Sequence, residues 1–126
     1  MLTSPLPRSP LSRLLWQGSF NSLMVTTLVT LANQPLIALV VLLALVGASV
    51  WVHGKWSVGF AVAVGIAGWV TEVVLQIAGP AWRYQVVEGF NPTGVPLYML
   101  ASWALVGLFS ACLADVMRPR GGADAA

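Results

Sequence analysis

The chain contains very little charge. Only 8% of its 126 residues are charged and 58% are hydrophobic, whereas about 25% of the residues in a typical soluble domain are charged. A chain of this kind has too few polar side chains to cover a surface in water. The composition therefore excludes an ordinary soluble protein and predicts an integral membrane protein that has the lipid bilayer as a partner.

Clustered basic residues, cysteine pairs and catalytic motifs are also missing. Six basic residues against four acidic ones give a formal net charge of +2, and they form no patch dense enough to predict nucleic-acid binding. Cys112 is the only cysteine, which excludes an intrachain disulfide and the usual Cys/His metal spacings. Nucleophile elbows and phosphate-binding loops are absent. We expect no metal, no cofactor and no nucleic acid.

Long uncharged runs predict four membrane helices. No charged residue occurs over 14–52, which is too long for one span of about 20 residues, and the polar sequence ANQP at 32–35 divides this run. The sequence HGKW at 53–56 predicts the next turn, and Gly79-Pro80 ends the third segment. We therefore predict an all-α, up-down four-helix membrane bundle over 14–116, with helices at about 14–33, 35–52, 56–79 and 95–116.

The two ends of the chain are predicted to lie outside this bundle. The segment 1–13 holds three prolines and three serines, which predicts a disordered tail, and 117–126 reads as a polar C-terminal tail. With four spans, Arg83 lies alone on one side and five basic residues lie on the other. Because basic residues accumulate on the cytoplasmic side, both termini are predicted to be cytoplasmic. The five residues are Arg8, Arg13, Lys55, Arg118 and Arg120.

The first hydrophobic segment has two other interpretations. If it did not cross the membrane, the basic residues would divide three against three. It could also be a cleaved signal peptide that begins with two arginines and ends near 30–32. Gln17, Asn21 and the hydroxyl-rich stretch 26–30 would form a poor hydrophobic region for a signal peptide. We therefore prefer a first helix that spans the membrane.

Glu72 is an acidic residue inside an otherwise apolar segment. It is the only charged residue between Lys55 and Arg83, and its position seven residues before Gly79 places it about 10 Å below the helix end. An acid near mid-membrane costs about 2.5–3.5 kcal/mol on insertion scales, and such residues usually have a function. We interpret Glu72 as a functional residue, with a structural hydrogen bond as the alternative.

Small and hydroxyl-bearing residues predict the surroundings of Glu72. Ala61, Gly65 and Gly68 precede it on one helical face, and small residues let another helix approach closely. The first helix carries a similarly spaced stripe of Ser19, Ser22, Thr26 and Thr30. We expect these stripes to be packing surfaces, although the hydroxyls could simply bond within their own helix. The alternative is a polar pocket that also includes Tyr98, Ser102 and Trp103 of the fourth helix.

Two more polar residues lie near helix ends. His53 is in the turn beside Lys55, where we expect a solvated side chain, with ligation of a pigment metal as the alternative. Asp115 is close to Arg118 at the end of the fourth helix, and we expect a solvated charge there. Neither residue is predicted to take part in catalysis.

The segment WVTEVVLQIAGPAWRYQVVEGFNPTGVPLYMLASWALVGLF (69–109) resembles known membrane proteins. In it Glu72 is followed by Gly79, Trp82 and Tyr84, then by 94–97 (GVPL), then by Trp103. This order resembles small uncharacterised bacterial membrane proteins of the pattern E…G…W-x-Y…G-[IV]-P-L…W. More distantly it is similar to the membrane-integrated carotenoid biosynthesis proteins, the hydratases and lycopene cyclases. The resemblance implies a multi-pass protein of the bacterial inner cell membrane.

The resemblance to carotenoid biosynthesis proteins also implies a chemistry. Glu72 would be the general acid that protonates a carbon–carbon double bond of a lipid-dissolved isoprenoid. Trp69, Tyr98 and Trp103 would stabilise the resulting carbocation through cation–π contacts.

Three functions therefore remain open from the sequence. We expect first a small multi-pass membrane protein that packs with itself or with a larger membrane complex. The alternatives are an isoprenoid-modifying or carotenoid-modifying enzyme with Glu72 as general acid, and a transporter or channel subunit with Glu72 as a proton or ion site. The last two functions require a cavity that reaches Glu72, whereas a structural role requires closed packing around it.

Overall fold

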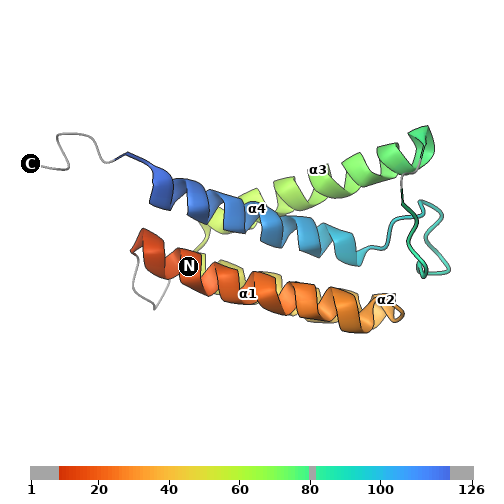
Figure 1. Cartoon of the computed structure of the whole chain (residues 1–126), viewed down its shortest axis with the longest axis horizontal. Helices are drawn as coiled ribbons and strands as arrows, with labels where there is room; N and C mark the ends of the chain where they lie inside the picture. Colours follow the sequence, from red (N-terminus) through yellow and green to blue (C-terminus); the bar gives the residue numbers. More distant parts are fainter. Residues whose placement is uncertain (1–8, 80–81, 120–126) are drawn as a thin grey trace, which may run out of the picture.

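The computed structural model describes residues 9–79 and 82–119. These residues form four helices and no strand: α1 (Pro10–Leu31), α2 (Pro35–His53), α3 (Trp56–Ala78) and α4 (Tyr98–Met117). Successive helices run in opposite directions, so α1 and α3 begin at the end of the molecule where α2 and α4 finish (Figure 1). The predicted all-α class with four helices is confirmed.

Two helix starts differ from the prediction for local reasons. α1 begins at Pro10 because the Ser9 hydroxyl accepts a hydrogen bond from the Ser12 amide at 3.2 Å, and proline suits a first helical turn. The predicted tail over 1–13 is therefore helical from Pro10, while 1–8 and 120–126 lie outside the described residues. α4 begins at Tyr98 rather than near 95, because Gly94 has a φ of 78° and Pro96 disfavours a helical conformation at the residue before it.

Three of the four helices are long and apolar enough to cross a membrane. They are α2, α3 and α4. α1 has 22 residues, but Gln17, Asn21 and several hydroxyl-bearing side chains make it less apolar. Four membrane spans were predicted, and three helices in the described part of the chain are long and apolar enough to be such spans.

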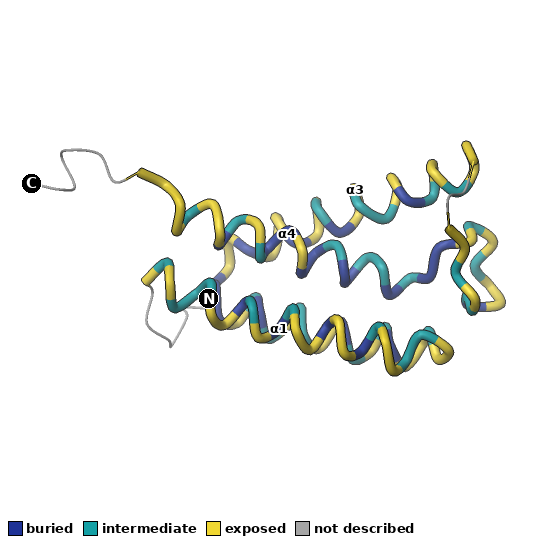
Figure 2. Tube along the Cα trace, viewed as in Figure 1, coloured by how far each residue is buried: buried dark blue, intermediate teal, exposed yellow. Residues whose placement is uncertain are grey.

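α4 is the central helix of the bundle. It contacts α1, α2 and α3, whereas α1 and α3 do not contact each other. Eight residues of α4 are buried, more than in any other helix, and Figure 2 shows buried residues along most of its length. The core includes Leu42 of α2 together with Leu105 and Leu108 of α4, all with no exposed surface. The position of each side chain is thus set mainly by how its helix meets α4.

Glycines allow α3 and α4 to approach closely. A Cβ atom on Gly65 would lie 2.7 Å from the carbonyl oxygen of Leu100, and one on Gly68 would overlap the Trp103 side chain. Ala61 is buried with Ala104 in the same contact. The small-residue stripe of α3 therefore packs against α4.

The hydroxyl stripe of α1 does not meet α3. Ser19, Ser22, Thr26 and Thr30 are exposed, and each hydroxyl donates to the carbonyl four residues earlier at 2.8–3.0 Å. Bonds of this kind satisfy a hydroxyl without a second helix. The expected packing of Ser22, Thr26 and Thr30 against the helix of Glu72 is therefore corrected, because α4 lies between α1 and α3.

Candidate functional site

Glu72 is buried and bonded to the loop that joins α3 to α4. Its side chain is 7% exposed, and the Tyr84 hydroxyl donates to Glu72 Oε2 at 2.5 Å. Short hydrogen bonds to a carboxyl group are among the stronger ones in proteins. The acid that is isolated in the sequence therefore has a specific partner 12 residues further along the chain.

The structure also brings Tyr98 and Trp103 into the region of Glu72. The ring of Tyr84 stands edge-on to that of Tyr98, with centroids 6.5 Å apart and planes at 82°. Trp103 lies against Gly68, one turn before Glu72 on α3. The indole Nε1 atoms of Trp103 and Trp69 are buried and have no hydrogen-bond partner among the described residues. Tyr98 and Trp103 thus lie on the elements next to Glu72, but Tyr84 is the residue that bonds to it.

A second buried acid, Glu88, fixes the same loop to the start of α4. Its Oε1 accepts from the Leu97 amide at 3.0 Å, and its Oε2 accepts from Asn91 Nδ2 at 3.0 Å. Unpaired amides at a helix start favour a negatively charged group there. Sequence reasoning missed this role, although an acid shortly before the turn-forming sequence NPTG was the available signal.

The rest of the loop is ordered by Asn91 and by a bond back to α3. Asn91 Nδ2 donates to the Val95 carbonyl at 2.8 Å, while its Oδ1 accepts from the Thr93 hydroxyl at 2.6 Å. Gln76 Nε2 donates to the Trp82 carbonyl at 2.9 Å. We call the bonds Tyr84–Glu72, Glu88–Leu97 and Gln76–Trp82 the loop clasp. The clasp closes one end of the bundle between α3 and α4.

Glu72 does not line any of four cavities that lie within 9–79 and 82–119. Its environment consists of α3, α4 and the clasped loop.

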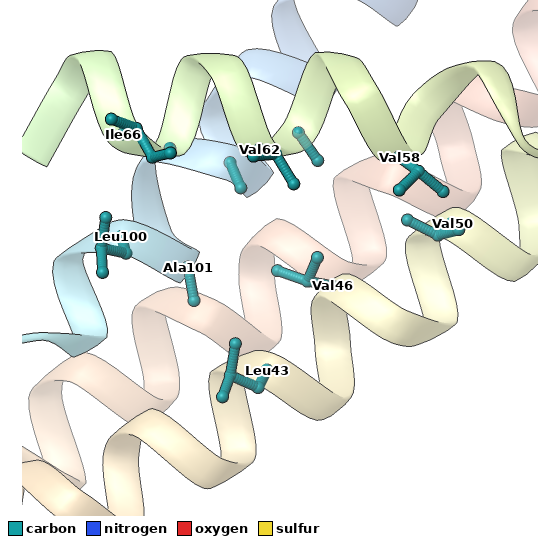
Figure 3. A pocket seen from close by; sticks show the side chains of 11 residues that line it. Leu43, Val46, Val50, Val58, Val62, Ile66, Leu100 and Ala101 are labelled. Carbon is teal, nitrogen blue, oxygen red and sulfur yellow. The ribbon is translucent and has the colours of Figure 1, made fainter.

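An apolar groove lies between α2 and α3, with α4 as its floor (Figure 3). Its volume is about 260 Å³. We call it the α2–α3 groove. Side chains of α2 and α3 face each other across it, and those of α4 lie at its base. Its lining includes Leu43, Val46, Val50, Val58, Val62, Ile66, Leu100 and Ala101.

A charged cavity of similar volume lies at the opposite end of the bundle from the loop clasp. It has a volume of about 270 Å³ and lies where α1 and α3 begin and α4 ends. We call it the terminal cavity. Its lining is Arg13, Trp56, Ala111, Cys112, Asp115 and Arg118.

His53 is buried behind the terminal cavity. The prediction of a solvated side chain is therefore wrong. It is 3% exposed, with its Nε2 2.8 Å from Gln17 Oε1 and 3.8 Å from Cys112 Sγ. Since the Gln17 amide nitrogen bonds to Asn21 Oδ1 at 2.8 Å, Gln17 Oε1 is the acceptor and His53 Nε2 donates. The prediction failed because the partner of His53, Gln17, lies 36 residues away in the sequence, and only the folded bundle brings the two together. The polar residues of the first segment were the only signal.

Several of the residues that carry the sequence resemblance belong to the loop clasp or to the turn beside it. Glu72 and Tyr84 bond to each other, Trp82 accepts from Gln76, and 94–97 form the turn into α4. Among the described residues, no group of three or more His, Cys, Asp or Glu side chains could hold a metal ion. The chain matches no family model, no curated protein and no solved structure.

Proposed function

We propose that this chain is a multi-pass membrane protein that associates with a second copy of itself through the α2–α3 groove. The observation that carries the proposal is the groove, which is apolar, open between two helices and floored by Leu100, Ala101 and Ala104 of α4. In this function Glu72 and the loop clasp hold α3 and α4 in the positions that form the groove. The isoprenoid-modifying and transport alternatives require access to Glu72, whose carboxyl group is bonded to Tyr84.

All four helices would cross the inner cell membrane of a bacterium, with α1 as the least apolar. A helix of 22 residues is about 33 Å long, and α1 runs alongside the others (Figure 1). Its polar amide at Gln17 is satisfied inside the bundle by His53 and Asn21. Polar groups at membrane depth are tolerated when they have such partners. This pairing supports a spanning α1.

Both termini would then lie in the cytoplasm. Arg13 lies in the first turn of α1, Lys55 directly before α3 and Arg118 directly after α4. These helix ends lie at one end of the bundle (Figure 1), whereas Arg83 lies in the loop that joins the other ends of α3 and α4, and this division fits the positive-inside rule. Reporters fused after Ala126 and after Lys55 should both report the cytoplasm, and one inserted within 85–92 should report the outside. A C-terminal reporter on the outer side would contradict the four-span arrangement.

The groove has the shape that favours a protein helix. Inside a bilayer, helices associate through close packing more than through burial of apolar area. Ala101 and Ala104 leave room at the floor, while Val46, Val58 and Val62 form the walls. Valine has few side-chain conformations to lose, so ordering these walls against another helix costs little entropy.

A second copy is the occupant that this geometry favours. Val62 and Ile66 form a ridge on α3 that is also one wall of the groove, and they are 56% and 52% exposed. A two-fold axis beside the groove would place the ridge of each copy in the groove of the other. Self-complementary contacts of this kind are the usual basis of symmetric dimers. One chain therefore supplies both halves of the interface.

Cysteine cross-linking tests this association. In a Cys112→Ala background, Val62→Cys should form a disulfide-linked dimer in oxidised membranes, because Val62 would lie near the two-fold axis. Val74→Cys is the matched control, since Val74 is also a valine of α3 and is also 56% exposed, but it does not line the groove. We expect most of the Val62→Cys chain and little of the Val74→Cys chain to migrate as a dimer.

Two results would contradict the proposal in different ways. Equal cross-linking at the two positions would mean that the groove is not the contact surface. Cross-linking of Val62→Cys to a different membrane protein, with no dimer, would replace self-association by a larger complex.

A further inference from the structure

The terminal cavity gathers charged side chains from two helices at one end of the bundle. Arg13 comes from the first turn of α1, and Asp115 and Arg118 come from the end of α4. Trp56, the first residue of α3, completes the wall. The small side chains of Ala111 and Cys112 on α4 leave space between the charged side chains and Trp56.

The charges of this lining are incompletely balanced. Two arginines face one aspartate, which leaves a formal excess of one positive charge. Asp115 and Arg118 approach only to 4.0 Å, and the Arg118 side chain is 76% exposed. A pair so loose and exposed contributes little. The guanidinium of Arg13 lines the cavity and has no hydrogen bond or ion pair with another residue of 9–79 or 82–119. A guanidinium carries five donors that can bind a ligand.

We propose that the terminal cavity binds the phosphate group of an anionic membrane lipid. Guanidinium groups match phosphate oxygens with paired, charge-assisted hydrogen bonds. The half-exposed indole of Trp56 is the side chain typical of headgroup depth. Basic pockets between helices on the cytoplasmic side bind lipid headgroups in this way. Arg13 and Arg118 would hold the phosphate, and Asp115 would oppose its charge.

The lipid is favoured over free phosphate by the position of the cavity. It lies at the ends of helices that are long and apolar enough to span a bilayer, which is where the phosphates of a leaflet lie. The inference rests on the membrane placement proposed above but not on self-association. A chain that fails to cross-link at Val62 can still bind the lipid, so the two proposals fail separately.

Lipid retention by the full chain provides the test. The protein is purified in mild detergent, mixed with phosphatidylglycerol or phosphatidylcholine, and observed by native mass spectrometry. We expect phosphatidylglycerol to remain bound preferentially and Arg13→Gln to weaken this retention at least about five-fold, since one basic group near a membrane surface contributes about 1 kcal/mol. Asp115→Asn should strengthen it. Arg13→Lys should retain part of the binding.

Lys55→Gln is the matched control. It removes one positive charge at the same end of the bundle, but Lys55 is exposed and does not line the cavity. We expect retention like that of the unchanged protein, and thermal melting of each variant checks its folding. Equal retention of the two lipids, or equal losses in Lys55→Gln and Arg13→Gln, would overturn the proposal. Displacement of phosphatidylglycerol by millimolar inorganic phosphate would overturn the assignment to a lipid.

Discussion

Replacing Gly68 with leucine should force α3 away from α4 and destabilise the protein by about 1–3 kcal/mol or more, the usual cost of overpacking. A Cβ atom at this position would overlap the Cβ and ring carbons of Trp103. These atoms belong to the rigid part of a large side chain, so they cannot move aside without a shift of α4. Because α4 contacts every other helix, the disturbance should spread through the bundle. Thermal melting in detergent measures the effect.

Gly59→Leu is the control for the same change of residue on the same helix. Nothing lies within 4 Å of a Cβ atom at Gly59, and leucine favours a helix more than glycine does by somewhat under about 1 kcal/mol. We expect this variant to melt at or slightly above the temperature of the unchanged protein. If Gly68→Leu behaved like Gly59→Leu, α3 and α4 would not be in the contact that places Glu72.

The second large effect should come from the bond between Glu72 and Tyr84. Glu72→Ala removes the acceptor and leaves a partly buried hydroxyl unsatisfied, which should cost about 1–3 kcal/mol. Tyr84→Phe removes the donor from the same bond. In a double-mutant cycle, the double variant should lose clearly less stability than the sum of the losses in the two single variants, because either change alone already breaks the interaction. Additive losses would mean that the two side chains do not interact.

Glu72→Gln separates a structural role from a chemical one. Glutamine keeps an oxygen that can accept from Tyr84 but cannot be ionised, so a structural Glu72 should tolerate it with little loss of stability. If Glu72 were a general acid or a proton site, this variant would fold normally but lose any isoprenoid conversion or proton-coupled transport of the unchanged protein. Assays of both properties on reconstituted protein distinguish the two roles.

The same bond predicts how stability changes at high pH. Burial, then the hydrogen bond and the charge of Glu72, raise the pKa of Tyr84 above its ordinary value. As the pH rises beyond about 10, the unfolded tyrosine loses its proton while the folded one keeps it, so stability falls. Below that pH this contribution is fully present. Tyr84→Phe should therefore show a shallower decline above pH 10 than the unchanged protein, and an identical decline would contradict the assignment.

The sequence predicted the bounds of the helices better than it predicted which helices contact each other. Proline and glycine positions gave the ends of α2 and α3 nearly to the residue, because they act within a single turn of chain. The partner of the small-residue stripe depended on which helix became central, and no pattern in α4 distinguishes it from the others. Glu72 was identified as a buried acid, but its bond to Tyr84 required the path of the loop. His53 was misjudged for the same reason, since only the assembled bundle places Gln17 beside it.

The bond between Gln17 and His53 also bears on how the chain could enter a bilayer. Outside the bundle, the side-chain amide of Gln17 would face hydrocarbon with only Asn21 of its own helix as a partner. Beside α2 it gains His53, and the short connection at 32–34 holds the two helices together. If the chain spans a membrane as proposed, the unit that is energetically able to insert is therefore the α1–α2 hairpin. The apolar helix α2 would then supply the favourable transfer free energy that allows α1, the least apolar helix, to enter the lipid with it.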